Sequence, residues 1–167
     1  TQVCKFCGAK VIGLTSSENK KNIALALGAD VVFLYDDDWK AKVLEAFPNG
    51  VDVVYDSVGT TMEDSLAVTK VLGQVVLYGL AGGSLRIGNP LWIIAHSKTI
   101  TGGDLWNYLT SREERIKRCS QLFKWIKDGS ITISPPTVFQ LSEGKQAHVF
   151  FESRKSTGKI IMVTDAS

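Results

Sequence analysis

Several features that would point directly to a function are scarce in this 167-residue chain. It has only three cysteines, an odd number without framework spacing, which suits a reducing compartment such as the cytoplasm. No stretch approaches the roughly 18–20 apolar residues that a membrane span needs. The net charge of +2 gives no field strong enough to argue for nucleic acid or membrane binding. We therefore expect a cytoplasmic globular protein that binds neither.

The signatures of metal and nucleophilic sites are missing as well. The sequence contains no G-x-S-x-G or H-E-x-x-H motif. Cys4-x-x-Cys7 lacks a second pair or a histidine cluster at zinc spacing, so we interpret it as structural or incidental. The run from Asp36 to Asp38 fits the acidic start of a helix better than a calcium loop, because no EF-hand spacing follows. We predict no metal site and name no catalytic side chain.

What the sequence does contain is a regular alternation of short apolar runs with segments of helical periodicity. The strands predicted in the first half lie at 10–16, 31–35, 51–59 and 73–79, and the helices between them at 18–27, 39–47 and 62–71. Short connections between alternating strands and helices are typical of a parallel α/β sheet with right-handed crossovers.

The second half has a different rhythm. A glycine-rich loop and a short helix are expected over 80–96, followed by a strand at 98–104, a helix at 111–129 capped by Ser111, an extended segment at 131–140, a helix at 142–153 and a strand at 159–164. No repeat, low-complexity tract or linker is visible.

Polar side chains gather where the first strand ends. Ser16, Ser17 and Lys20 stand at the start of a predicted helix, where backbone N–H groups and the helix dipole favour a phosphate. Because no Asp or Glu stands at this strand tip, the 2′-phosphate of NADP is favoured over an unmodified ribose. The alternative is an ordinary serine cap beside an exposed lysine.

Tyr35, at the end of the next strand, offers a flat ring that could cover an adenine, or it is a half-buried strand-end aromatic. The turns Ser57-Val58-Gly59 and Tyr78-Gly79-Leu80 follow the two later strands. Their glycines either let a ligand approach the backbone closely or simply turn the chain.

Six phrases carry a family resemblance by their order and spacing: GAKVIGLTSSENK, LGADVVFLY, GVDVVYDSVG, GQVVLYGLAGG, LTSREE and ESRKSTGKIIM. Together they resemble the C-terminal half of zeta-crystallin-like NADPH:quinone oxidoreductases, zinc-independent members of the medium-chain dehydrogenase/reductase superfamily. The resemblance covers nearly the whole chain. It implies a Rossmann-type doubly wound parallel sheet, NADP(H) as cofactor, and hydride transfer to a small-molecule quinone or other α,β-unsaturated carbonyl.

The resemblance also implies roles for individual residues. Ser16, Ser17 and Lys20 would meet the adenosine phosphate, and Tyr35 the adenine. The remaining implied cofactor contacts lie in three turns: Ser57, Gly59 and Thr60; Tyr78, Gly79 and Leu80; and Gly103, Asp104 and Leu105. The last two turns would line the nicotinamide side. Strand 98–103 resembles the family's edge strand, which pairs across a two-fold axis to form a homodimer.

This chain differs from the family pattern in what precedes its first residues. In the family, a first strand, an A-x-x-G-G-V-G phosphate loop and a GroES-like catalytic domain would precede residue 1. We therefore expect a fragment, inactive alone, with a partial Rossmann domain over 1–130 and a segment over 131–167 that returns to the catalytic domain. The missing strand would leave a slot between the strands at 10–16 and 51–57.

Two other functions stay open. One is a non-catalytic Rossmann-like module for dimerisation or binding that no longer holds cofactor, which the missing phosphate loop favours. The other is the cofactor domain of a zinc-dependent alcohol dehydrogenase, whose zinc ligands would lie mostly in the missing domain.

Overall fold

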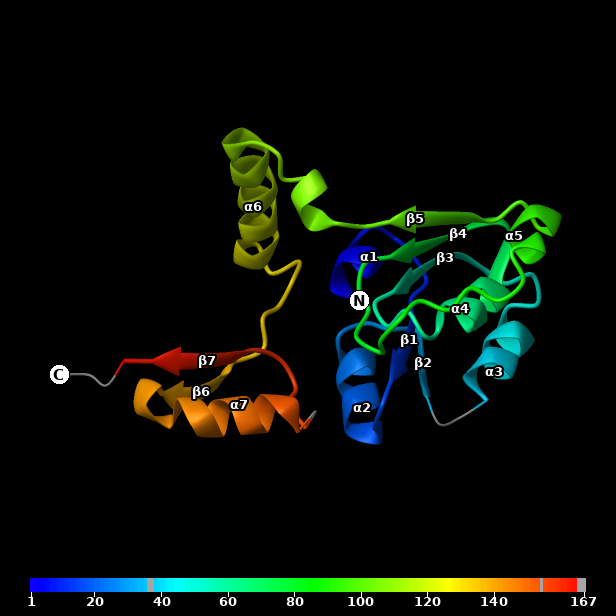
Figure 1. Cartoon of the computed structure of the whole chain (residues 1–167). Coiled ribbons are helices and arrows are strands. Elements are labelled where there is room, and N and C mark those ends of the chain that lie inside the picture. Colours follow the sequence, from blue (N-terminus) through cyan, green and yellow to red (C-terminus); the bar gives the residue numbers. More distant parts are fainter. Residues whose placement is uncertain (36–37, 154, 165–167) are drawn as a thin grey trace. The chain divides into compact units, whose positions relative to one another are not determined.

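The structure is a computed structural model that describes residues 1–35, 38–153 and 155–164 (Figure 1). The chain divides into two compact units, which we describe separately. The first unit comprises Thr1–Gly13, Ser17–Val32 and Cys119–Ser167. The second unit comprises Leu14–Ser16 and Phe33–Arg118.

A three-stranded parallel sheet forms the centre of the second unit. Its order is β3 (Val51–Asp56), β4 (Thr69–Leu77) and β5 (Thr99–Gly102), which lie side by side in Figure 1. Helix α4 (Met62–Val68) packs on β3 and β4. Met62 and Val75 are fully buried at this contact together with Leu66, so the core of the unit lies between α4 and the sheet.

Shorter elements complete the second unit. These are α3 (Trp39–Ala46), α5 (Leu91–Ala95) and the 3₁₀ helix η1 (Leu105–Asn107). The carboxylate of Asp38 accepts a hydrogen bond from the Ala41 N–H at 3.3 Å and caps α3, which confirms the acidic helix start. Asp36 and Asp37, named with it in that prediction, lie outside the described residues.

The first unit contains mainly helices and a separate two-stranded sheet. Its elements are α1 (Gln2–Phe6), α2 (Glu18–Ala26), the C-terminal half of α6 (Arg112–Lys127), β6 (Thr137–Gln140), η2 (Leu141–Glu143), α7 (Gly144–Glu152) and β7 (Ile160–Val163). The parallel strands β6 and β7 pack on α7, where the rings of Phe139 and Phe150 lie 5.9 Å apart. The ring centroids of Phe6 in α1 and Trp125 in α6 lie 5.3 Å apart.

Strands β1 (Ile12–Thr15) and β2 (Val31–Leu34) pair only with each other among the described residues. The N–H of Val31 donates to the Val11 carbonyl, and the N–H of Tyr35 donates to the Thr15 carbonyl. Both partners advance in the same direction along the chain, so the pair is parallel. The strands therefore form the α/β arrangement that the sequence predicts, divided among separate sheets.

The boundary between α4 and β4 differs from the prediction. The helix expected over 62–71 ends at Val68, and the strand expected at 73–79 begins at Thr69. The Thr69 hydroxyl donates to the Ser65 carbonyl at 2.6 Å, and Thr69 pairs with Val51 beyond a register shift. Pairing with the sheet thus overrides the helical periodicity of these residues, and Leu72 takes a left-handed backbone with φ of 62°.

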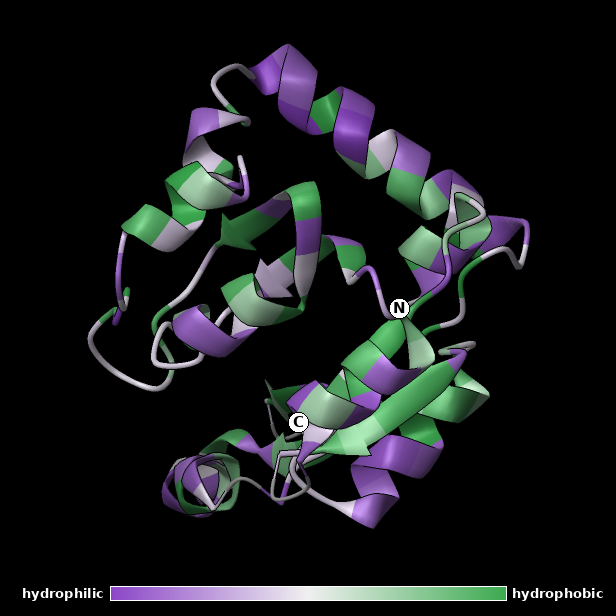
Figure 2. Cartoon of the chain, turned by 90° about the vertical axis from the view of Figure 1, so that its right-hand side faces the viewer, coloured by the Kyte–Doolittle hydropathy of each residue, from purple (hydrophilic) through white to green (hydrophobic). Residues whose placement is uncertain are grey.

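Hydropathy follows the elements. In Figure 2 the strand ribbons are mostly green, whereas the longest helix, α6, is mostly purple. Ser111 caps α6 by accepting a hydrogen bond from the Glu114 N–H at 3.2 Å, as predicted. Within the described ranges, no helix is long and apolar enough to cross a membrane.

Candidate functional site

Three of the predicted turns meet at one edge of the second unit. Strands β3, β4 and β5 run parallel, so their carboxyl ends lie at the same edge of the sheet. The turns that follow contain all nine residues predicted on this side: Ser57, Gly59, Thr60, Tyr78, Gly79, Leu80, Gly103, Asp104 and Leu105. The structure therefore brings these nine residues to one place, and their roles stay a prediction.

The turns after β3 and β4 pack closely against each other. A Cβ added at Gly79 would lie 2.8 Å from the Ser57 carbonyl oxygen, and one added at Gly59 would lie 2.6 Å from Leu80 Cδ2. Gly59 also has φ of +81°, a conformation that side chains disfavour. The N–H of Gly103 donates to the Leu77 carbonyl at 2.8 Å. Close approach of backbone atoms thus requires glycine at position 79, and the positive φ favours glycine at position 59.

A buried carboxylate organises the first of these turns. Asp56, the last residue of β3, is 3% exposed. Its Oδ1 accepts hydrogen bonds from the N–H groups of Val58 at 2.8 Å and Gly59 at 2.9 Å. Its Oδ2 accepts from the hydroxyls of Thr61 at 2.9 Å and Ser65 at 2.8 Å. Burial alone would raise the pKa of this carboxyl, but the four hydrogen bonds outweigh it and hold the pKa below its ordinary value.

The sequence prediction did not include Asp56. The available signal was an aspartate at a strand end, followed by a glycine turn and by hydroxyl residues five and nine positions later. Aspartate in this position commonly accepts hydrogen bonds from backbone N–H groups two and three residues ahead. That pattern distinguishes a turn-forming carboxylate from one that coordinates a metal or faces solvent.

Tyrosines surround the same edge. Tyr35, directly after β2, is 43% exposed. Burial raises the pKa of its hydroxyl, and Asp56 and Tyr78 add to the rise, so these three side chains lie within electrostatic reach of one another. The rings of Tyr78 and Tyr55 lie 6.4 Å apart in an edge-on arrangement. Tyr55 and Tyr78 are both exposed.

The predicted phosphate residues lie at the start of α2. Ser17 is its N-cap, and its hydroxyl oxygen accepts a hydrogen bond from the Lys20 N–H at 3.4 Å. Ser16 is exposed, and the side chains of Ser17 and Lys20 are half-buried. The capping role is confirmed for Ser17. A capped helix start with a lysine in its first turn has the donors and the positive end of the helix dipole that an anion requires.

Asp104 has a local partner. Its carboxylate accepts a hydrogen bond from the Trp106 N–H at 3.0 Å and caps η1. Leu105 and Trp106 are both exposed beside it. This turn therefore presents an apolar surface next to the ends of β4 and β5.

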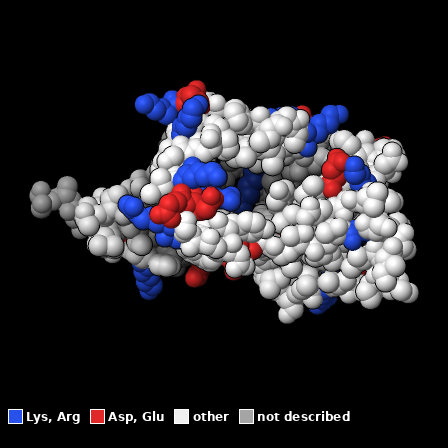
Figure 3. Space-filling view, turned by 90° about the horizontal axis from the view of Figure 1, so that it is seen from above, with Lys and Arg blue, Asp and Glu red and all other residues white. Residues whose placement is uncertain are grey.

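Charge around the molecule is mixed. On the face that Figure 3 shows, basic and acidic atoms lie in small groups of both signs. In the part of the chain that the structure describes, no three His, Cys, Asp or Glu side chains gather as a metal site would require. Cys4, Cys7 and Cys119 are free thiols.

The family model of the zinc-binding dehydrogenases matches residues 1–126. The chain belongs to the zinc-binding dehydrogenase family. The described residues of this family member do not themselves offer a ligand set for zinc. We therefore assign none of them a role toward a metal.

Relatives place the chain more narrowly within the zinc-binding dehydrogenases. It is 32% identical to a probable quinone oxidoreductase of Schizosaccharomyces pombe, over 97% of this chain and 50% of the relative. It is 32% identical to a Burkholderia 2-haloacrylate reductase, again over 97% and 50%. The solved quinone oxidoreductase of Escherichia coli, complexed with NADPH, matches with a TM-score of 0.88 and 32% identity, over 97% of this chain and 52% of that one.

These matches confirm the resemblance to quinone oxidoreductases and the Rossmann-like α/β fold. The chain spans about half the length of the curated relatives it matches.

Proposed function

We propose that this chain is the NADPH-binding part of an oxidoreductase that transfers hydride to quinones or other α,β-unsaturated carbonyls. The observation that carries the proposal is the packing of the turns after β3, β4 and β5 at one sheet edge, with Asp56 buried beneath the first. Ligands of open parallel α/β sheets bind at this edge. The solved Escherichia coli relative holds NADPH, which supports the choice of nucleotide.

The start of α2 is proposed to hold the adenosine phosphate. The hydroxyls of Ser16 and Ser17 and the ammonium of Lys20 supply hydrogen-bond donors and positive charge to a 2′-phosphate. Tyr35 is proposed to cover the adenine with its partly exposed ring. Glu18 in the first turn of α2 pairs with Lys21, and the residue at the tip of β1 is not acidic, so the donor set fits a phosphate better than a bare ribose.

The turns of the second unit are proposed to hold the nicotinamide side. Gly59 and Gly79 let the two turns pack against each other, while the hydroxyls of Ser57 and Thr60 and the exposed ring of Tyr78 supply polar and stacking contacts. When bound, the nucleotide supplies the hydride, and the chain orients it and excludes water. We assign no side chain as proton donor.

The substrate and the assembly are further parts of the proposal. Trp106 is exposed next to Leu105, the last residue of the predicted nicotinamide turn, and suits a planar, apolar substrate such as a quinone. Strand β5 pairs with β4 alone among the described strands, so its other edge can pair with β5 of a second copy. Sedimentation that shows only monomer at all concentrations would contradict the homodimer.

Two further parts of the proposal concern organisation. Residues 1–130 form the nucleotide-binding portion, and 131–167 form a segment that packs on a separate catalytic domain. A quinone-dependent NADPH oxidation assay tests the function when it is run on the 167-residue chain and on the longest natural form of the protein. We expect activity in the longer form and little in the chain alone. Inactivity of both, with NADPH binding absent, would favour a non-catalytic module.

A further inference from the structure

The turn that Asp56 organises supports the next turn along the sheet edge. Three backbone hydrogen bonds connect them: Tyr78 N–H to the Asp56 carbonyl at 2.9 Å, Ala81 N–H to the Ser57 carbonyl at 3.0 Å, and Gly82 N–H to the Val58 carbonyl at 2.9 Å. Each acceptor lies within three residues of the Asp56 carboxylate. The position of the turn after β4 therefore depends on the position of the turn after β3.

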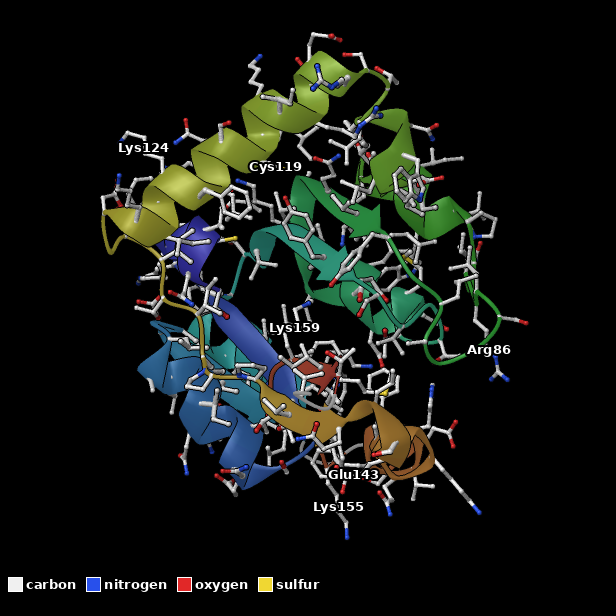
Figure 4. All side chains as sticks on the ribbon, turned by 90° about the vertical axis from the view of Figure 1, so that its left-hand side faces the viewer. Arg86, Cys119, Lys124, Glu143, Lys155 and Lys159 are labelled. Atoms are coloured by element: carbon white, nitrogen blue, oxygen red, sulfur yellow. The ribbon has the colours of Figure 1, made fainter. Side chains whose placement is uncertain are left out.

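The two turns also pack closely against each other, so one cannot move without displacing the other. Besides the contacts of Gly59 and Gly79, a Cβ added at Gly82 would lie 2.5 Å from Thr60 Oγ1 and 2.6 Å from Val58 Cγ1. Further along the same loop, the Arg86 N–H donates to the Gly59 carbonyl at 3.5 Å, while the Arg86 side chain extends away from the loop (Figure 4). The two turns are thus connected by backbone hydrogen bonds and by the side chains of Val58 and Thr60, which pack against Gly82.

We propose that Asp56 is the positioning residue for the nicotinamide side of the cofactor site. Its carboxylate fixes the turn at 57–60, and through that turn it fixes residues 78–82 in the geometry that receives the ring. The inference rests on the proposed function. Asp56 lies beneath the turns and acts through them, so it is not a catalytic residue.

The two oxygens of Asp56 have separate tasks. Oδ1 holds the backbone amides of Val58 and Gly59, and Oδ2 ties the turn to α4 through Thr61 and Ser65. Asparagine has the same size but is neutral, and it presents N–H donors where one of the carboxylate oxygens accepts. Because hydrogen bonds to an ionised acceptor are stronger than those to a neutral one, Asp56→Asn loosens the turn without leaving a cavity.

The test compares Asp56→Asn with Asp52→Asn. Asp52 stands four residues earlier on β3, is exposed and pairs with Lys70. Calorimetric titrations use NADPH and 2′,5′-ADP, a nucleotide that carries the adenosine 2′-phosphate but no nicotinamide. We expect Asp56→Asn to weaken NADPH binding about tenfold and to change 2′,5′-ADP binding less than about twofold. The Asp52→Asn variant should bind both as the unsubstituted chain does.

Amide hydrogen exchange of the ligand-free chain provides a second reading. In Asp56→Asn, the amides of Ala81 and Gly82 should exchange faster, while those of α7 keep their rates. If Asp56→Asn does not fold, Ser65→Ala removes one hydroxyl donor to Oδ2 and should produce a smaller loss of NADPH affinity in the same direction.

Three outcomes would overturn the inference. NADPH binding unchanged in Asp56→Asn would show that the turns do not need the carboxylate. An equal loss for both nucleotides, with faster exchange throughout the chain, would show a purely structural role. Failure of the unsubstituted chain to bind either nucleotide would instead overturn the proposed function, and the role of Asp56 toward the cofactor with it.

Discussion

Replacing Gly79 by alanine tests the close packing of the two turns at the sheet edge. The new Cβ would lie 2.8 Å from the Ser57 carbonyl oxygen, whereas ordinary contacts begin at 3.4 Å. The atoms in the way belong to the backbone, so a side-chain rotation cannot relieve the contact. The turns must separate, which strains the hydrogen bond from Ala81 to Ser57.

Two terms set the size of the effect. Overpacking costs about 1–3 kcal/mol, and a weakened backbone hydrogen bond adds about 0.5–1.5 kcal/mol. We therefore expect Gly79→Ala to lower the free energy of unfolding by about 1.5–4.5 kcal/mol in a urea titration, with no change in the dependence of that free energy on urea concentration. It should also weaken NADPH binding.

Gly102→Ala is the matched control for this experiment. Gly102 ends β5, has no atom within 4 Å of an added Cβ and does not have a positive φ. Its substitution should change the free energy of unfolding by less than about 0.5 kcal/mol. If Gly79→Ala were as stable as Gly102→Ala, the described contact between the turns would be refuted.

Other predictions concern the helix start, the core and the buried carboxylate. Ser17→Ala removes the α2 cap and should lower the free energy of unfolding by about 0.5–2 kcal/mol in urea titrations, and an unchanged value would contradict the capping role. Met62→Ala empties a fully buried site between α4 and the sheet, and should cost about 2–5 kcal/mol by the same measurement. Because the folded pKa of Asp56 lies below the ordinary value of 3.8, its contribution to stability is complete above that value and is lost as the pH falls below it. In Asp56→Asn, the free energy of unfolding should therefore depend less steeply on pH in this acid range than it does in the unsubstituted chain. An equally steep dependence in both would contradict the lowered pKa of Asp56.

Local signals predicted most of the elements. Ser17 and Ser111 cap the helices that were expected to follow them, and Gly28, just beyond the helix expected over 18–27, takes a positive φ. Such positions are readable because each depends on one residue type and its immediate neighbours.

Element boundaries that depend on strand pairing could not be predicted from such local signals. Thr69 ends α4 because it pairs with Val51, a residue eighteen positions away whose register no local pattern specifies. The candidate site shows the same division. In the site, the glycines and the local signal of Asp56 stand in the sequence, but the hydrogen bonds from the turn after β4 to the turn after β3 depend on the pairing of the two strands.

The measurement that tests the central claim most directly is a calorimetric titration of the 167-residue chain with NADPH and with NADH, alongside Lys20→Ala. The account predicts micromolar binding of NADPH, weaker binding of NADH, and loss of that preference in Lys20→Ala, because the lysine supplies charge to the 2′-phosphate. Equal binding of both nucleotides, unchanged by Lys20→Ala, would contradict the assignment of the α2 start as the phosphate site. Binding of neither would contradict a nucleotide-binding role for this chain.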